Sequence, residues 1–372
     1  MMRPLEGLLV LDFSTLLPGP LASLVLAEAG ARVVKIERPG RGDEMRSYEP
    51  RVGEDSVNFL MLNRGKQSIA IDLKAPDALE RLKPLISIAD VIIEQFRPGV
   101  MDRLGLGYEA VRRLNPKLVY CSVTGWGQTG PKAQVAAHDL NYMAETGVLG
   151  LSAGADGAPV LPPVLAADVA GGTLPAIINI LLALRQRDLT GYGCHLDVAM
   201  GDNLFTFLYW ALGEGFTGNG WPQGGQSLVT GGSPRYQVYR TRDGRYLAAA
   251  PLEDKFWEAF TRIIDLPEPL RDPAAPVETV KAAVAERIAA RTADDWRAAF
   301  AGQDVCCSIV ATLEEAVSDE HVAARRLFAH ALKANGGEIP ALPVPLAPVF
   351  RPVATRATAP RLGETVDPML SV

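Results

Sequence analysis

The N-terminal part of the chain alternates short apolar runs with amphipathic helical patterns. An apolar run at Leu8–Leu11 is followed by a Pro-Gly-Pro turn at 18–20, a helical pattern over 21–29 and a second apolar run at Val33–Ile36. Gly30 stands where the helix is expected to stop. A strand, a helix and a second strand in this order predict a βαβ unit with parallel strands.

Further segments of the same two kinds follow as far as about residue 200. Strands are expected at Ser68–Ile71, Val91–Ile93 and Leu118–Val123, and helices at Ala75–Ile88, about 173–187 and about 199–213. Strands that alternate with helices are typical of a doubly wound parallel sheet. We therefore predict an α/β fold, with a Rossmann-like large domain over residues 1–213.

The pattern changes after residue 213. Residues 214–235 are rich in glycine and contain two prolines, which predicts a flexible linker. Residues 236–332 begin with two alternating segments around Asp243-Gly244, a hairpin signal, and continue with five helical patterns, so we predict a small α+β domain. Residues 333–372 are proline-rich and aperiodic, which suits a tail that wraps over another surface.

Composition narrows the class of protein. The chain has 372 residues, 48% of them apolar and 22% charged, as in soluble globular proteins of two domains. A net charge of −6 argues against nucleic acid as a partner. The four cysteines show no metal-ligand spacing, so we expect no metal site and a reducing, cytoplasmic location. The longest strongly apolar helical run, Leu174–Leu184, is too short to span a membrane, and the chain shows no secretion signal.

The βαβ start, which ends in Glu37, raises the possibility of a dinucleotide site. The loop over 14–20 offers one glycine where three are needed for a pyrophosphate to approach the backbone, which disfavours NAD. Basic residues nevertheless recur after the predicted strands, where a doubly wound sheet holds its ligands, although each could equally be a solvated surface charge. They are Arg38, Arg64, Lys66, Lys74, Arg97 and Arg103.

Two proton-transfer groups lie thirty residues apart, each near a predicted turn. His138 follows a glycine-rich loop, and an imidazole suits proton removal near neutral pH, although a histidine there is often structural. Asp168 precedes a helix, so it could cap that helix, or it could act beside free N–H groups that hold an oxyanion. Glu253, which follows a strand of the small domain, allows the same capping interpretation.

Eight motifs together resemble the family III (CaiB/BaiF) CoA transferases, the group that also contains the α-methylacyl-CoA racemases. The similarity runs in order from about residue 5 to 260. The motifs are Leu5-Glu6-Gly7, Pro18-Gly19-Pro20, Gly30 to Glu37, Asn63 to Ser68, Asp72-Leu73-Lys74, Phe96 to Gly99, Arg103-Leu104-Gly105 and Thr124 to Pro131.

The resemblance implies a specific reaction and site. The racemases carry histidine before the aspartate that is Asp139 here, whereas many transferases carry tyrosine, so His138 implies a racemase. His138 and Asp168 would then exchange a proton at the carbon beside the thioester, with Glu253 contacting the histidine. The residues that the resemblance places around the CoA are Arg38, Asp72, Leu73, Lys74, Arg97, Arg103, Ala137, Asp139, Asn141 and Tyr142.

Two alternatives stay open. In a transferase, Asp168 would attack the thioester and carry the acyl group as a mixed anhydride. The long Gly40–Phe59 segment and the Gly224-Gly225-Gln226 loop resemble the transferases, and Leu362–Thr365 lacks the histidine often found in the family's C-terminal motif. A binding module without turnover is the second alternative.

The resemblance also implies how the chain assembles. It implies an interlocked homodimer, with the tail completing the large domain and the active site between the large domain of one subunit and the small domain of the other. The acyl-CoA thioester is the expected partner, and no cofactor beyond the CoA of the substrate is expected.

Overall fold

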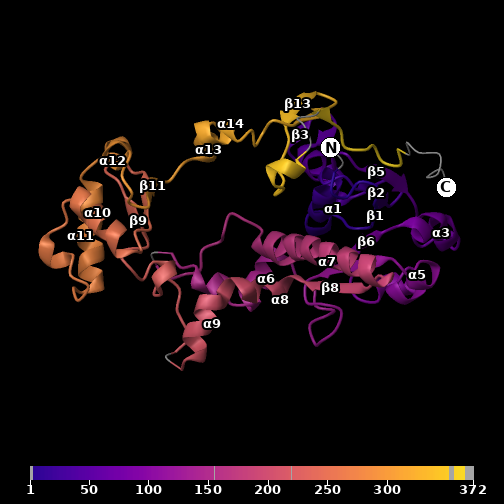
Figure 1. Cartoon of the computed structure of the whole chain (residues 1–372), viewed down its shortest axis with the longest axis horizontal. Coiled ribbons are helices and arrows are strands. Elements are labelled where there is room, and N and C mark those ends of the chain that lie inside the picture. The colour runs from indigo at the N-terminus through magenta and orange to yellow at the C-terminus, as the bar shows by residue number, and fades with distance from the viewer. Residues whose placement is uncertain (1–2, 155, 219, 352–355, 365–372) are drawn as a thin grey trace. The chain divides into compact units, whose positions relative to one another are not determined.

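The computed structural model describes residues 3–154, 156–218, 220–351 and 356–364. The chain divides into two compact units (Figure 1). The large unit comprises residues 1–146, 163–207 and 323–372, and the small unit comprises 147–162 and 208–322. Residues 147–162, expected in the large domain, therefore belong to the small unit.

A six-stranded parallel sheet forms the centre of the large unit. Its order is β5-β2-β1-β6-β7-β8, which confirms the predicted α/β fold with a parallel central sheet. The strands are β1 (Leu9–Asp12), β2 (Arg32–Glu37), β5 (Gln67–Ala70), β6 (Val91–Glu94), β7 (Val119–Thr124) and β8 (His195–Ala199). The strand order reverses between β1 and β6, and ligands of such sheets bind outside the carboxyl ends of the strands at this point.

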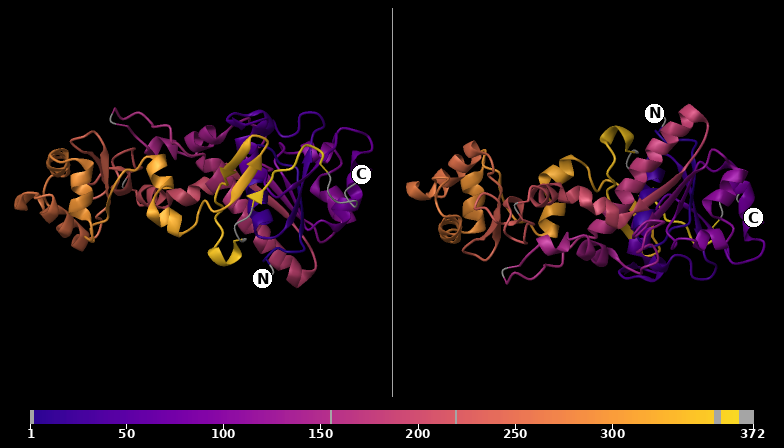
Figure 2. Two further views of the ribbon diagram at one scale, coloured as in Figure 1. Left: turned by 90° about the horizontal axis from the view of Figure 1, so that it is seen from above. Right: turned by 90° about the horizontal axis from the view of Figure 1, so that it is seen from below.

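Helices cover both faces of this sheet (Figure 1, Figure 2). On one face, α3 and α5 share a core with alternate residues of the strands, such as Leu9 and Leu11 of β1. On the other face, α1 packs against α7. The helices of the large unit are α1 (Pro18–Glu28), α2 (Val57–Asn63), α3 (Ala78–Ile88), α4 (Val100–Arg103), α5 (Tyr108–Leu114), α6 (Asp139–Glu145), α7 (Leu174–Thr190) and α8 (Met200–Leu204). Burial on both faces explains why the central strands read as continuous apolar runs.

The expected single helix at 199–213 is wrong. The chain first adds β8, the edge strand of the sheet, and then forms α8, a 3-10 turn at Phe205–Leu208 and α9 (Tyr209–Phe216). β8 pairs with β7 over five residues, but its first and third residues, His195 and Asp197, are exposed. A short edge strand with polar side chains lacks the apolar run that marked the other strands.

A wide π-helical turn at Ala167–Thr173 continues into α7, so the two form one helix of 24 residues. Ala166 is its N-cap and Asp168 lies in its first turn, so the capping role considered for Asp168 is wrong. The helix is long and apolar enough to cross a membrane by length and composition alone, a test that a core helix of a soluble protein also passes.

The small unit is built on an antiparallel sheet in the order β11-β10-β9. Its elements are β9 (Gln237–Arg240), β10 (Tyr246–Ala249), β11 (Cys307–Ile309), α9, α10 (Asp254–Ile263), α11 (Val277–Ala289), α12 (Ala293–Phe300) and α13 (Leu313–Val317). Glycines of the expected linker make close contacts here. A Cβ on Gly232 would lie 1.9 Å from the Gln226 carbonyl oxygen, and one on Gly224 would lie 2.8 Å from that of Gly150. These glycines therefore permit tight packing within the unit.

The segment that leads into the tail differs from its prediction. The helix expected at 321–331 is confined to α14 (Glu320–Ala324), and a hairpin of β12 (Ala331–Ala334) and β13 (Gly337–Pro340) follows. β14 (Arg356–Ala357) joins β12 in parallel. Fully buried Leu332 packs against Leu60 of α2. Two small hairpin strands, β3 (Arg51–Val52) and β4 (Asp55–Ser56), precede α2.

The π-turn packs so closely on α8 that it requires a glycine. A Cβ on Gly171 would lie 2.4 Å from the Met200 carbonyl oxygen, so we expect Gly171→Ala to destabilise the fold by about 1–3 kcal/mol through overpacking. Gly213→Ala is the control, because no atom lies within 4 Å of that position in α9, and alanine should stabilise the helix by about 0.5–1 kcal/mol. Denaturant unfolding measures both; equal effects of the two substitutions would contradict the packing argument.

Candidate functional site

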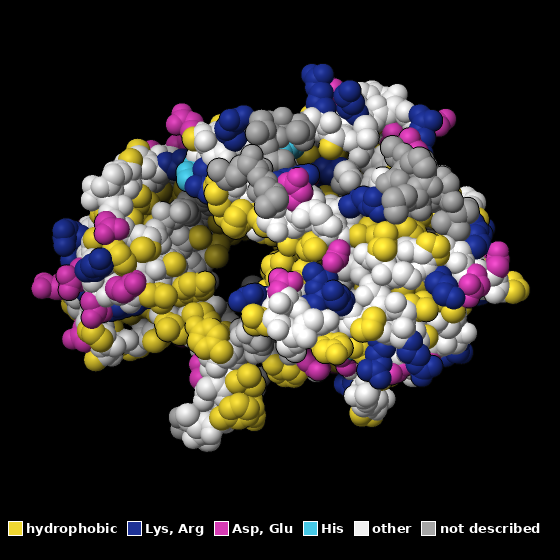
Figure 3. Space-filling view, turned by 45° about the vertical axis from the view of Figure 1, so that its right-hand side comes forward, with side chains coloured by type: hydrophobic (Ala, Val, Ile, Leu, Met, Phe, Trp, Pro, Cys, Tyr) yellow, Lys and Arg dark blue, Asp and Glu magenta, His cyan; other side chains and the backbone are white. Residues whose placement is uncertain are grey.

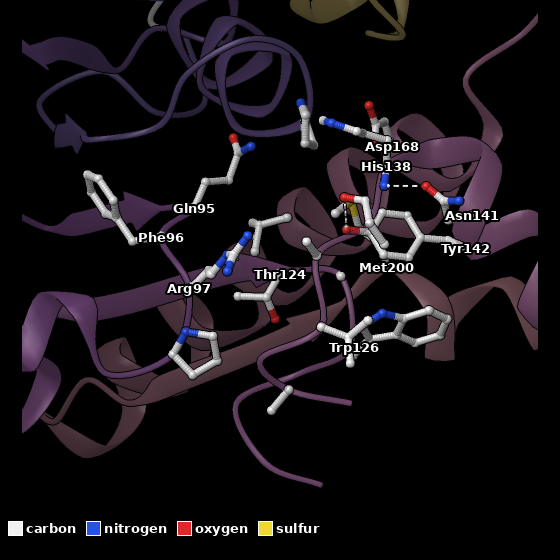
Figure 4. Close-up of a pocket in the computed structure, with 18 of the residues that line it drawn as sticks. Gln95, Phe96, Arg97, Thr124, Trp126, His138, Asn141, Tyr142, Asp168 and Met200 are labelled. Carbon is white, nitrogen blue, oxygen red and sulfur yellow. Dashed lines mark hydrogen bonds between the residues drawn. The ribbon is translucent and has the colours of Figure 1, made fainter. Parts of the chain in front are cut away.

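A pocket of about 410 Å³ lies in the large unit, at the carboxyl ends of β1, β6, β7 and β8. We call it the site pocket. Gln95, Phe96 and Arg97 lie on one side of it, and His138, Tyr142 and Asp168 on the other (Figure 4). The remaining lining residues are Thr15, Leu16, Pro18, Pro98, Val123 to Trp126, Ala133, Val135 to Ala137, Asn141 and Met200. The pocket therefore occupies the place that the strand order predicts for a ligand.

The start of α1 leaves no backbone donor for a pyrophosphate. Pro18 and Pro20 have no N–H group, and the Gly19 N–H donates to Oε1 of Gln95 at 2.9 Å. The next N–H, of Leu21, donates to the carbonyl of Leu17 at 2.9 Å. A Rossmann-type dinucleotide site depends on free N–H groups at this turn, so the structure gives a physical reason for the missing glycine fingerprint.

His138 is held at the start of α6. It occupies the N-cap position in an extended conformation, and its backbone N–H donates to Oδ1 of Asn141 at 3.0 Å. The Tyr142 hydroxyl donates to the carbonyl of Ala137 at 2.9 Å and so fixes the preceding residue. The backbone is thus bound on both sides of His138, while its side chain is exposed at the pocket.

Asp168 has an unusual environment for a carboxylate. Its backbone N–H donates to Oδ1 of Asp139 at 2.9 Å, so the two acidic residues lie close together. Burial and the neighbouring Asp139 carboxylate raise the pKa of Asp168 to about 6, against an opposing effect of His138. A carboxyl group with this pKa exchanges a proton readily near neutral pH, and both Asp168 and His138 line the site pocket.

The expected N–H donors beside Asp168 are not free. The N–H of Asp168 is used by Asp139, and the N–H of Val169 donates to the carbonyl of Leu165 at 3.0 Å. The expected oxyanion role of these two groups is therefore wrong. The side-chain amides of Gln95 and Asn141 also line the site pocket, and each oxygen accepts a backbone N–H and leaves the amino group for another partner.

A second pocket, of about 530 Å³, lies in the loop after β2. We call it the arginine pocket, because its lining includes Arg38, Arg41, Arg46 and Arg51. The Arg46 guanidinium is paired with Glu37 at 2.7 Å, whereas Arg38 and Arg41 are exposed. Several guanidinium groups in one concave site suit an anionic ligand such as a phosphate.

The predicted basic crevice forms only in part. Arg97 lines the site pocket and Arg38 the arginine pocket. Arg64 and Lys66 are instead buried in ion pairs, with Glu28 at 2.6 Å and with Asp12 at 3.1 Å. The expectation that these two bind a ligand is therefore wrong, because their charges are already paired inside the fold.

The remaining predicted site residues lie in different places. Asp72, Leu73 and Lys74 follow β5 and Arg103 ends α4, and all four lie outside the lining of both pockets. Asp139 lies behind Asp168, buried rather than facing a ligand. Glu253 is the N-cap residue of α10 in the small unit, but its side chain forms no capping hydrogen bond.

Sequence reasoning missed several lining residues. Gln95 and Thr124 stand at the carboxyl ends of β6 and β7, a position that is itself a signal for ligand contact. Trp126 and Met200 gave no such signal, because aromatic and apolar residues are ordinary core residues. Among the described residues, no group of three or more His, Cys, Asp or Glu side chains is placed to hold a metal ion.

The fold and the site pocket define an α/β protein with two proton-transfer groups at the switch point of a parallel sheet. Residues 5–366 match the model of CoA-transferase family III. The chain belongs to this family.

Individual relatives differ in their reactions. The human α-methylacyl-CoA racemase is 34% identical, with 98% of this chain and 92% of the relative covered. An acetyl-CoA:oxalate CoA-transferase from Acetobacter aceti is 33% identical, with 97% and 93% covered. The crystal structure of a CaiB/BaiF family protein from Brucella suis superposes with a TM-score of 0.83 at 29% identity, over 98% of this chain and 97% of that one.

The raised pKa of Asp168 predicts a stability gain on its neutralisation. The pKa lies above the usual 3.8, so the folded state loses stability as the pH rises through about 6. We expect Asp168→Asn, which resembles the protonated form, to be more stable than the wild type by roughly 1–3 kcal/mol at pH 8, with a smaller difference at pH 5. Chemical denaturation at both pH values measures this. An equal difference at pH 5 and 8 would contradict the assignment.

Proposed function

We propose that this protein is an α-methylacyl-CoA racemase or epimerase that transfers a proton at the carbon next to the CoA thioester. The observation that carries the proposal is that His138 and Asp168 line one pocket, where burial and Asp139 raise the pKa of the Asp168 carboxyl group to about 6. Imidazole and such a carboxyl group can each accept or donate a proton near neutral pH.

The two groups act from opposite sides of the carbon. One removes the α-proton and the other returns a proton to the opposite face, so the overall reaction changes configuration only. As the proton leaves, negative charge moves onto the thioester oxygen, and stabilising this charge is the largest demand on the site. We assign that role to the amino groups of the Gln95 and Asn141 side chains, whose oxygens are already engaged.

The CoA moiety accounts for the basic residues. The arginine pocket offers Arg38 and Arg41 to its phosphates, and Arg97 lies on the wall of the site pocket. Asp72 to Lys74 and Arg103 remain candidate contacts along the outer course of the CoA. The anionic end and the thioester end would then bind in two separate pockets of one unit.

A family III CoA transferase is the second candidate. Asp168 would attack the thioester carbonyl, release the CoA thiolate and hold the acyl group as a mixed anhydride. A pKa of about 6 leaves the carboxylate largely ionised at pH 7, so Asp168 suits this reaction too. The relative from Acetobacter aceti supports this candidate to a similar degree. His138, which the transferase reaction does not require, favours the racemase.

Exchange of the α-proton tests the proposal. In deuterated water with a 2-methylacyl-CoA and no added acid, we expect the wild type to incorporate deuterium and to invert configuration. His138→Ala and Asp168→Ala should each lose about 10²-fold or more of this rate, because each removes one of the two proton-transfer groups. His321→Ala, at an exposed helical histidine, is the matched control and should be unchanged. Mass spectrometry and chiral chromatography follow the products.

The transferase predicts the opposite pattern. No exchange by the wild type, together with CoA transfer to an added carboxylic acid that survives His138→Ala, would overturn the racemase proposal. A hydroxamate on Asp168, formed when hydroxylamine attacks the aspartyl carbonyl of the mixed anhydride and releases the acyl group as its carboxylate, would identify the anhydride.

We also propose a homodimer in which Glu253 of one copy contacts His138 of the other. The exposed face of α7 supports association: Ile178, Leu182 and Leu189 are 56%, 63% and 69% exposed. Apolar side chains are interspersed with charged ones on the molecular surface (Figure 3). A row of exposed apolar side chains on one helix face indicates a surface that another protein surface covers.

A charge on this face should prevent association. We expect Leu182→Glu to convert a dimer into a monomer in sedimentation analysis, because the carboxylate would be buried without a partner. Asn179→Glu, at an exposed polar position about a quarter turn away on α7, is the control and should remain a dimer. A monomeric wild type that binds phospholipid vesicles would show instead that the apolar face contacts a membrane.

A further inference from the structure

Asp43 is a buried carboxylate whose contacts reach the loops of both pockets. It lies in the loop after β2 with 1% of its surface exposed. Its Oδ1 accepts the backbone N–H of Leu16 at 3.1 Å and that of Met45 at 3.0 Å. Its Oδ2 pairs with Nζ of Lys35 at 2.9 Å, and both side chains are fully buried. One carboxylate therefore fixes two loops.

These two loops form walls of the two pockets. Leu16 lines the site pocket that contains His138 and Asp168. Asp43 and the 3-10 turn at Glu44–Ser47, which Asp43 caps, line the arginine pocket. The bond from Leu16 to Asp43 is therefore a direct connection between the pockets.

The connection holds Leu16 in a costly conformation. Leu16 has a φ of +63°, in the left-handed region that residues with a Cβ rarely adopt. The carbonyl of Ser14, two residues earlier, accepts a hydrogen bond from Nζ of Lys35 at 2.7 Å. Lys35 and Asp43 thus bind the backbone of the loop on both sides of Thr15. A strained backbone conformation persists only where such contacts impose it.

We propose that Asp43 is a positioning residue that couples phosphate binding in the arginine pocket to the geometry of the site pocket. The inference rests on the proposed function in one respect, namely that the ligand is a CoA thioester. The nucleotide phosphates, bound by Arg38 and Arg41, restrain the loop that carries Asp43, and Asp43 in turn restrains Leu16. Binding energy from the distant end of the substrate is thereby used at the reacting end.

The test compares two substrates that share an acyl group. One is the 2-methylacyl-CoA and the other the same acyl group on pantetheine, which lacks the nucleotide. For the wild type, we expect the nucleotide to raise kcat by about tenfold as well as to lower KM, since remote contacts then assist the chemical step. For Asp43→Asn, we expect the two kcat values to agree within about twofold while the nucleotide still lowers KM.

Asp90→Asn is the matched control. Asp90 also accepts a backbone N–H, that of Leu9 at 2.8 Å, and pairs with Arg187 at 2.7 Å, but it precedes β6 at the amino end of the sheet. The Asp90→Asn substitution removes the same kinds of contact at a position away from both pockets. The ratio of kcat for acyl-CoA to kcat for acyl-pantetheine should therefore stay as in the wild type. Thermal unfolding of both variants separates lost stability from lost coupling.

Three results would overturn the coupling. The first is a wild-type ratio of kcat for acyl-CoA to kcat for acyl-pantetheine that is near one. The second is an Asp43→Asn variant that keeps the wild-type ratio, and the third is an Asp90→Asn variant that loses it. If the wild type transfers CoA instead of exchanging the α-proton, the proposed function fails but the same ratio is measured on transfer. If it does neither, calorimetry with 3′-phospho-ADP and acyl-pantetheine decides: mutual enhancement of binding that Asp43→Asn abolishes supports the coupling, and independent binding contradicts it.

Discussion

Two buried ion pairs that join the end of β1, strand β2, the loop after β2 and the residue before β5 are the constraint on which the rest of the large unit depends. Lys35 pairs with Asp43 and Lys66 with Asp12, and all four side chains are fully buried. Burial raises the pKa of Asp12, but Lys66 and Lys35 outweigh it and hold this pKa well below its usual range. Losing one partner leaves an uncompensated buried charge, at a cost of about 3–5 kcal/mol. These charges therefore join the loop from Ser14 to Leu16 to the loop around Asp43.

The surroundings also shift the pKa of Asp168, but upward rather than downward. Asp12 has two lysines beside it and stays ionised, whereas burial and the neighbouring Asp139 carboxylate raise the pKa of Asp168 to about 6. Asp12, which stays ionised, stabilises the fold through its ion pair, whereas Asp168, whose pKa is near neutral, is suited to proton transfer. Two aspartates of one unit thus acquire different roles through their surroundings.

The parts of the fold that depend on local pattern could be predicted from the sequence. The central strands β1, β2, β6 and β7 were predicted because burial on both faces gives each a largely apolar run, and the edge strand β5 was predicted from the short segment Ser68–Ile71. β8 was not, since an edge strand with exposed His195 and Asp197 carries no such run. The site was predictable to the extent that it follows strand ends and turns, as His138 and Asp168 do. The ion pairs of Arg64 with Glu28 and of Lys66 with Asp12 join residues far apart in sequence, so both cations appeared to be free surface charges.

Under the proposed function, the roles assigned to the site residues account for two reactions in one family. Asp168 has a pKa that allows both proton transfer and nucleophilic attack, so this residue alone does not select between them. The amides of Gln95 and Asn141, held by the backbone N–H groups of Gly19 and His138, suit the developing thioester oxyanion of either reaction. What differs is the need for a second proton-transfer group across the pocket, which only the racemase has. We therefore infer that His138, on a backbone fixed at the start of α6, selects the reaction, while the buried charges beneath the loops keep the pocket in place for either.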